Sequence, residues 1–425
     1  MKDFYLKPKF FETIKNYNKN QFTKDIVAGI IVAIIALPLS IALAIASGAT
    51  PAQGIYTAIF AGFVIALLGG SKVQIAGPTA AFATIVAGII STEGMSGLII
   101  ATLMAGIILI LMGVLKLGSL IKFVPKTITV GFTAGIAVTI FLGQIKDFLG
   151  ITYPKGTTAI EAFEKMEANI HNFVTANWQS LAVGAICLAI LIIYPKFEKR
   201  VPPSLIAVIV GVVLVAFVPA FKDVRTIETA FDPIEPGFPK FVLGDISISM
   251  DKVIALLPNA FIIAFLAGIE SLLSCVVADG MIKDKHNPNA ELVAQGLGNM
   301  ASVAFGGIPA TGAIARTAAN IKNGGNSPVS GMVHAAVLLL VMLFLIPYAS
   351  LIPMPTIAAI LFIVAYNMSE WRSFLKITKQ KVFTDILVMV LTFVLTVAFD
   401  LVVAILVGLA LHFIIVIVKK IGKKA

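Results

Sequence analysis

The chain has 425 residues, of which 59% are hydrophobic and 13% are charged, and its mean hydropathy is +1.00. Soluble globular proteins carry about 25% charged residues, so this composition excludes a soluble protein and predicts a polytopic membrane protein. The net charge of +10 is concentrated at the two ends of the chain and in short loops between apolar runs. That distribution follows the positive-inside rule, and it does not indicate a nucleic-acid-binding protein.

Apolar runs long enough to cross a bilayer, roughly 17–25 residues, recur from Ile26 to Val418. They predict an all-α protein with about fourteen transmembrane segments. An even number places both termini on one side of the membrane, and the lysines at both ends make that side the cytoplasm. The segments lie near residues 25–46, 52–69, 79–91, 96–115, 127–149, 179–194, 203–219, 254–276, 290–305, 312–321, 330–349, 355–367, 383–398 and 401–418.

Two of these segments, 79–91 and 312–321, are short, and each begins after a break that is rich in Gly and Pro. Paired interrupted segments in two halves of a chain are typical of inverted-repeat transporters, and they mark the binding site. The alternative is that each break is a proline kink in an ordinary helix.

The breaks occupy equivalent places in the two halves. Thr311 follows Thr79 by 232 positions, and Glu270 follows Pro38 by the same interval. Two repeats of about seven segments each would be inverted, because that number is odd. The predicted organisation is a cytoplasmic N-terminal segment 1–24, a first repeat 25–220, an extracytoplasmic linker 221–251, a second repeat 252–418 and a basic cytoplasmic tail 419–425.

A half-helix that begins inside the membrane has unpaired N–H groups in its first turn, and their partial positive charge suits an anion. Two such ends facing each other would form an anion cradle from backbone alone. Arg316 follows the second break, and its guanidinium stays protonated and matches the oxygens of carboxylate, bicarbonate or sulfate. The predicted cradle is formed by Thr79, Ala80 and Ala81 at one end and by Thr311, Gly312 and Ala313 at the other.

Glu270 lies in an otherwise apolar stretch, 260–278. An ionisable group at bilayer depth is energetically costly and is therefore a candidate functional residue. Its carboxylate would repel a neighbouring anion, whereas protonation removes that repulsion, so the residue predicts proton–anion symport. A sodium ion held by Glu270 and Ser274, one helical turn apart on the same face, would serve the same purpose. A third interpretation is a structural ion pair between Glu270 and Arg316.

Other chemistries find no support in the sequence. Cys187 and Cys275 lie in apolar runs and are typical of small buried side chains, and the four histidines show no metal-ligand spacing. No nucleotide-binding loop or nucleophile–base pair stands out. We therefore expect no enzyme activity, no metal site and no cofactor other than a co-transported proton or sodium ion.

The motifs around these residues resemble those of bacterial members of the SulP (sulfate permease) family of anion transporters. The resemblance extends from the first predicted segment to the tenth. It is carried by Leu37–Ala44, Pro51–Tyr56, Gly77–Pro78, Val130–Ala137, Gly268–Ser274 with Val277–Gly280, and Gly307–Thr317.

The resemblance implies inverted repeats that form a core and a gate domain, with half-helices at segments 3 and 10. It also implies elevator-like alternating access, a homodimer and the inner membrane of a bacterium. By position, the anion site includes Thr79, Ala80, Ala81, Ala313, Ile314, Ala315 and Arg316, and the coupling-ion site includes Glu270 and Ser274.

The chain departs from the family pattern in two places. Ala315 stands where many members have Ser, so backbone groups must carry more of the anion binding. Members usually continue into a cytoplasmic STAS domain, whereas this chain ends at Ala425, and we expect a membrane domain without a STAS domain.

The sequence therefore predicts a secondary active transporter of a small anion such as a dicarboxylate, bicarbonate or sulfate. Glu270 favours proton symport, because the dicarboxylate-type branch of the family has Glu there and is associated with protons. The alternatives are a sodium-coupled bicarbonate or sulfate symporter and an uncoupled anion channel or exchanger. A nucleobase–cation symporter of the same general fold is disfavoured by Arg316. The expected partners are the small anion and the lipid bilayer, with no nucleic acid.

Overall fold

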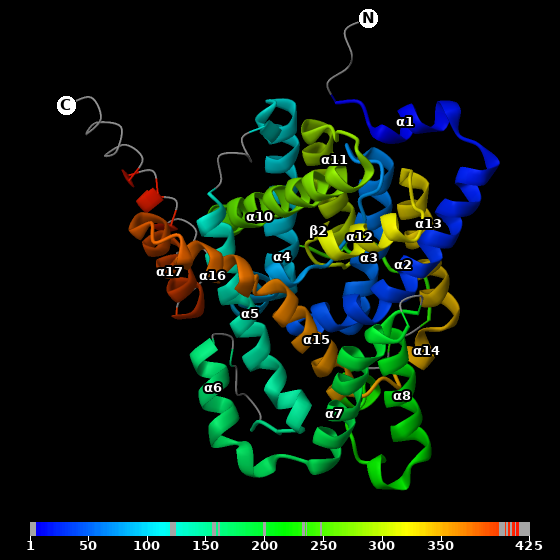
Figure 1. Cartoon of the computed structure of the whole chain (residues 1–425), viewed down its shortest axis with the longest axis vertical. Coiled ribbons are helices and arrows are strands. Elements are labelled where there is room, and N and C mark those ends of the chain that lie inside the picture. Colours follow the sequence, from blue (N-terminus) through cyan, green and yellow to red (C-terminus); the bar gives the residue numbers. More distant parts are fainter. Residues whose placement is uncertain are drawn as a thin grey trace, which may run out of the picture.

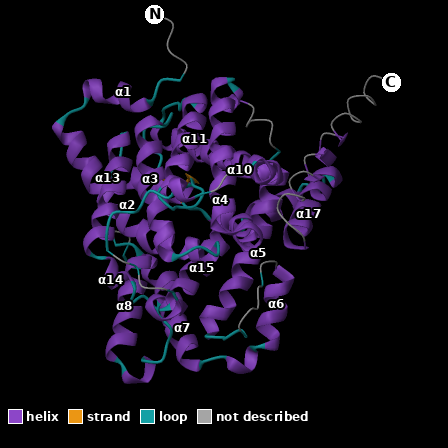
Figure 2. Ribbon diagram, turned by 180° about the vertical axis from the view of Figure 1, so that it is seen from behind, coloured by secondary structure: helices purple, strands orange, loops and turns teal. Residues whose placement is uncertain are grey.

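A computed structural model describes residues 6–119, 125–154, 159, 162–198, 201–231, 234, 236–246 and 249–398, and from 399 to 415 it describes 404, 407–408, 410–412 and 414–415. The predicted tail 419–425 and most of the predicted segment 401–418 lie outside these residues. Within them the protein is almost entirely helical (Figure 2). Six of the described helices are long and apolar enough to cross a membrane, which confirms an all-α polytopic protein, while the count of about fourteen segments stays a prediction.

The first group of helices, here called the core group, occupies the upper part of Figure 1 and contains both breaks. It consists of α2 (Lys19–Ala46), α3 (Pro51–Leu68), α4 (Ala83–Val114), α10 (Met250–Ile282), α11 (Pro288–Ala304), α12 (Ile314–Lys322) and α13 (Pro328–Phe344). Small residues let these helices approach closely. A Cβ at Gly296 on α11 would lie only 2.5 Å from the carbonyl oxygen of Gly106 on α4, so this crossing requires glycine.

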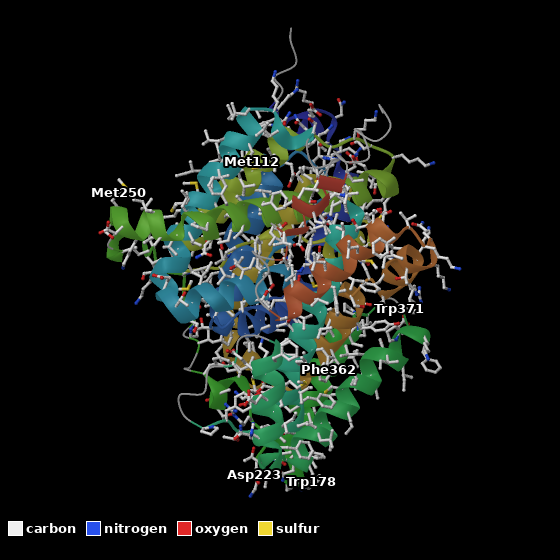
Figure 3. The ribbon with its side chains drawn as sticks, turned by 90° about the vertical axis from the view of Figure 1, so that its left-hand side faces the viewer. Met112, Trp178, Asp223, Met250, Phe362 and Trp371 are labelled. Carbon is white, nitrogen blue, oxygen red and sulfur yellow. The ribbon has the colours of Figure 1, made fainter. Side chains whose placement is uncertain are left out.

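The second group, here called the gate group, includes the helices in the lower part of Figure 1. It consists of α5 (Lys126–Leu149), α6 (Ala162–His171), α7 (Trp178–Ile193), α8 (Pro203–Phe217), α15 (Met354–Met368), α16 (Trp371–Lys379) and α17 (Phe383–Ala398). Phe362 of α15 lies near the middle of Figure 3, and its ring centroid is 4.7 Å from that of Phe141 and 5.0 Å from that of Phe148, both on α5. These aromatic contacts bury large apolar surfaces and hold α15 against α5.

Short helices complete the described part of the fold. Two helices of the gate group, α6 and α16, fall outside the predicted segments, because they are short and charged whereas the prediction searched for long apolar runs. The remaining short elements are α1 (Lys9–Thr13), α9 (Ile227–Ala230), α14 (Ile346–Ala349) and the 3-10 helices η1 (Ile14–Asn16), η2 (Ala80–Phe82), η4 (Phe173–Thr175), η5 (Tyr194–Lys196), η6 (Pro219–Phe221) and η7 (Leu243–Asp245).

Each break is a short extended strand rather than a kinked helix. Strand β1 (Ala76–Gly77) pairs antiparallel with β2 (Thr311–Gly312), so that Ala76 lies opposite Gly312. Figure 2 shows the strands in orange, surrounded by helices of the core group. Backbone at membrane depth must satisfy its hydrogen bonds within the protein, and the two breaks do so by pairing with each other. The proline-kink alternative is therefore wrong for both.

The predicted segments 79–91 and 96–115 correspond to two helical stretches within η2 and α4, which meet at Gly94, where the backbone is not helical. The φ of Gly94, 69°, lies at positive values, where glycine is favoured because it has no Cβ. The predicted segment 254–276 belongs to a longer helix, since α10 extends from Met250 to Ile282. The boundaries of the two repeats stay a prediction.

Candidate anion-binding site

The first half-helix begins where β1 ends. Thr79 is extended, with φ −128°, and its side chain does not cap η2. Instead its Oγ1 donates a hydrogen bond of 3.0 Å to Oε2 of Glu270, which is half-buried on α10. Ala80 and Ala81 follow and are buried. An ionisable carboxyl group therefore lies at the start of the first half-helix.

Two of the predicted cradle amides are already used inside the protein. The N–H of Gly312 donates to Oγ of Ser271 at 3.0 Å. The N–H of Ala313 donates to the carbonyl oxygen of Ile75 at 2.8 Å, which extends the pairing of the two strands. These bonds hold the start of the second half-helix in place. Because the N–H groups of Gly312 and Ala313 already have acceptors, an anion at this helix would have to bind the N–H groups of the residues after Ala313.

The next amides lie on the accessible side of the second half-helix. The first intrahelical bond runs from the N–H of Thr317 to the carbonyl oxygen of Ala313, at 2.9 Å. The N–H groups of Ile314, Ala315 and Arg316 precede it and have no intrahelical partner. Ile314 is 45% exposed and Ala315 is also exposed, so α12 begins at an accessible pair of residues.

Arg316 lies behind the strands rather than on the accessible face. Its side chain is 2% exposed, and Nη2 donates a 2.7 Å hydrogen bond to the carbonyl oxygen of Pro78. A Cβ at Gly77 would overlap Nη1. Among the described residues no ion pair joins Arg316 to Glu270, so the structure does not show the structural-pair interpretation. Arg316 instead fastens the second half-helix to the residue before Thr79.

Helix α10 also contacts the second break. The hydroxyl groups of Ser271 and Thr311 lie 2.7 Å apart. The hydroxyl of Ser274, which is fully buried, donates to Oγ1 of Thr317 on α12 at 3.4 Å. That oxygen also accepts the N–H of Ile75 at 3.0 Å. Ser274 therefore supports α12 and β1, and its hydroxyl is engaged away from the carboxyl of Glu270.

A second buried acid stabilises the chain that leads into the first break. Glu291 on α11 is fully buried and accepts from the N–H of Gly70 at 2.9 Å and from the side-chain amides of Gln74 at 2.7 Å and Gln295 at 2.9 Å. Gln74 in turn lies directly against Gly312, where a Cβ would overlap its amide. This hydrogen-bond network fixes the chain before β1 and beside β2.

Sequence reasoning missed Ser271 and Glu291. Ser271 adjoins Glu270, and its spacing of three residues from Ser274 puts both hydroxyls on one face of α10, a signal that was present in the sequence. Glu291 stands near the start of a predicted segment, where an acid is ordinarily taken as interfacial. Its burial depends on partners that are distant in sequence.

The geometry brings together two helix starts, a fixed guanidinium and a half-buried carboxyl. The helix starts favour an anion, whereas the carboxylate form of Glu270 opposes one. Among the described residues no three His, Cys, Asp or Glu side chains come together as a metal site.

Two half-helices that begin beside paired strands inside an all-α membrane bundle define the class of inverted-repeat membrane transporters. A model of the sulfate permease family matches residues 22–392, and the chain belongs to this family. The resemblance that the motifs indicated is thus confirmed.

Two relatives of the chain are named as transporters. The chain is 46% identical to the "Putative sulfate transporter YvdB" of Bacillus subtilis (strain 168), over 96% of this chain and 76% of that protein. It is 35% identical to the bicarbonate transporter BicA of Picosynechococcus sp. (strain ATCC 27264 / PCC 7002 / PR-6), over 90% of this chain and 68% of that protein.

Solved structures share the fold. The transmembrane domain of a cyanobacterium bicarbonate transporter BicA matches with a TM-score of 0.82 and 30% identity, covering 92% of this chain and 98% of that one. Murine Slc26a9, an anion transporter in the inward-facing state, matches with a TM-score of 0.88 over 98% of this chain and 72% of that one. At 18% identity this second match shows the fold alone.

Proposed function

We propose that the protein is a secondary active transporter that moves a small anion, such as a dicarboxylate, bicarbonate or sulfate, together with a proton. The observation that carries the proposal is the hydrogen bond between Thr79 and Glu270. It joins an ionisable carboxyl to the start of a half-helix whose positive end suits an anion.

The proposed preference of the site for anions rests on the positive charges beside the paired strands β1 and β2. The start of α12, at the exposed residues Ile314 and Ala315, lies on one side, and the start of η2 at Ala80 lies on the other. The buried guanidinium of Arg316 adds a full positive charge behind them. The names of the two relatives support an inorganic oxyanion as the substrate, with sulfate and bicarbonate as the first candidates.

The proton follows from the placement of Glu270. A deprotonated carboxyl at this position would repel an anion bound at the helix start, and the free energy of that repulsion is relieved when the carboxyl takes a proton. Anion binding and proton binding then favour each other by the same factor. A gradient of either species can therefore drive the other.

Elevator-type movement is supported by the division into two groups of helices. The candidate site residues, from Thr79 to Arg316, lie on α10 and α12 of the core group or in the two breaks between its helices. A rigid movement of the core group against the gate group would carry the site as a unit and leave its geometry unchanged. We extend the proposal to a homodimer in a bacterial inner membrane, with both termini in the cytoplasm.

Sodium coupling is the second candidate. It would need oxygen ligands around Glu270, and the hydroxyl of Ser274 is engaged with Thr317 instead. An uncoupled channel or exchanger has no use for a half-buried carboxyl beside the anion. Proton symport is therefore the form of coupling that the contacts favour.

Uptake into proteoliposomes tests the proposal. Labelled sulfate, bicarbonate and fumarate are each offered with an inward proton gradient, an inward sodium gradient or no gradient. The proposal predicts that at least one of the three accumulates against its own gradient when protons flow inward. Accumulation driven by sodium alone would replace the proton by sodium, and equilibration without accumulation would indicate an uncoupled pathway.

A further inference from the structure

A cavity of about 500 Å³ lies beside the first turns of α4, between the core group and the gate group. Its core side includes Ala83 and Thr84, which follow η2 directly, and its gate side includes the second half of α5 and the segment from Arg225 to Phe231. The predicted extracytoplasmic linker 221–251 contributes to its wall. The cavity is thus one helical turn away from the start of the first half-helix.

Positive charge predominates in this cavity. Lys146, Lys165 and Arg225 line it, together with a single acid, Asp147. Among the described residues none of the three cations has a carboxylate partner within 4.0 Å. The ammonium of Lys146 lies 4.7 Å from the ring centroid of Tyr153, which is also in the wall. A cleft lined by charge of one sign concentrates ions of the other sign.

Two polar atoms in the wall have no partner. Oγ1 of Thr84 and Oε1 of Gln144 are buried atoms without a hydrogen bond among the described residues, and both residues line the cavity. Buried polar atoms are nearly always satisfied, so such atoms indicate a missing partner. A hydroxyl can donate to an anion, and rotation of the Gln144 amide would present its NH₂ group in place of the oxygen.

We propose that this cavity is an outer anion-binding site, in which an oxyanion is held by Lys165, Arg225 and Thr84 before it reaches the transport site. The identity of the anion rests on the proposed function, whereas the site itself rests on the cavity, its unpaired cations and its unpartnered polar atoms. Because its wall comes from both groups of helices, the site is assembled only when the core group takes the position seen here.

The proposed outer site should bind an anion less tightly at alkaline pH. Burial lowers the pKa of Lys165 from 10.5 to about 8, although the charge of Glu164 opposes this. Lys165 is therefore charged below about pH 8 and neutral above it, so the attraction for an anion falls as the pH rises through 8. Lys165 packs against Gly143 of α5.

Lys146, Asp147 and Arg225 are the charged groups that face Lys165 across the cavity. Burial and the charge of Asp147 raise the pKa of Tyr153 to about 12, so its phenol stays neutral between pH 7 and pH 9. The change expected over this range is assigned to Lys165, and the K165M and K165R variants test that assignment.

Thiol labelling of a cysteine placed in the wall tests the site without relying on transport. T84C protein in proteoliposomes is treated from outside with an anionic and a cationic methanethiosulfonate of similar size, and the ratio of the two rates is measured. The ratio cancels the thiolate fraction, and the unsubstituted chain gives the background, because Cys187 and Cys275 are buried. We expect the anionic reagent to react faster at pH 7 and the ratio to fall by about fivefold at pH 9.

The K165M change in the T84C background should give the low ratio at both pH values, and K165R should keep the high ratio at both. K222M is the matched control, since Lys222 is an exposed cation of the same linker that does not line the cavity, and it should behave like T84C alone. Equal rates for the two reagents, or an unchanged ratio in K165M, would overturn the proposal. If the protein transported none of the anions, the proposed function would be wrong, but the labelling result would still test the outer site, because labelling does not depend on transport.

Discussion

Removing the guanidinium of Arg316 should weaken anion binding by about 10- to 150-fold. In R316A the carbonyl oxygen of Pro78 loses the 2.7 Å hydrogen bond that Nη2 donates, and the start of the first half-helix loses its fastening to α12. A hydrogen bond to a charged group contributes about 1.5–3 kcal/mol, and each 1.4 kcal/mol changes a binding constant about tenfold. Isothermal titration of the purified protein with the transported anion measures the change.

Two further variants separate charge from position. R316K keeps a positive charge but cannot reproduce the planar fork of the guanidinium, so it should bind the anion better than R316A and less well than the wild type. G77A keeps Arg316 but places a Cβ where Nη1 now lies, so it should weaken binding in the same direction. Wild-type affinity in R316A would refute the role of this residue, and wild-type affinity in G77A would refute the positioning argument.

Three more substitutions test the support of the site. S271A should lower the free energy of unfolding by about 1–3 kcal/mol, because the buried N–H of Gly312 loses its acceptor, and thermal unfolding in detergent measures it. E291Q should destabilise the protein by a similar amount, about 1–3 kcal/mol, since an amide turns one of its NH donors toward a donor of the network, while the anion dissociation constant stays unchanged. F362A should lower the free energy of unfolding by about 1–3 kcal/mol, because it removes two aromatic contacts between α15 and α5 that contribute about 0.5–1.5 kcal/mol each. An unchanged unfolding midpoint in any of the three would contradict the contact assigned to that residue.

The class of fold and the location of the site could be predicted from sequence because both depend on long-range patterns of polarity. Apolar runs identify the membrane segments, and the Gly/Pro breaks before Thr79 and Ala313 mark where those runs fail. The 232-residue offset relates the breaks to each other, and the structure pairs the same two breaks as β1 and β2.

The use of individual donors could not be predicted, since it depends on contacts between residues far apart in the chain. The amide of Gly312 is committed to Ser271 and that of Ala313 to Ile75, which no local pattern indicates. The direction of the Arg316 side chain follows from the absence of a Cβ at Gly77. Helix α16 was not predicted, because it is short and contains charged residues, whereas the prediction of helices rested on long apolar runs.

The most direct test of the central claim is anion uptake by E270Q protein, measured with and without the cation gradient that drives the wild type. The amide oxygen of Gln can still accept the hydrogen bond of Thr79, so the site should keep its geometry and bind the anion. D279N, which changes another acid of α10 that pairs with His286, is the matched control and should stay coupled. We predict that E270Q equilibrates the anion and no longer accumulates it in response to the gradient, whereas accumulation at the wild-type level would contradict the coupling role of Glu270.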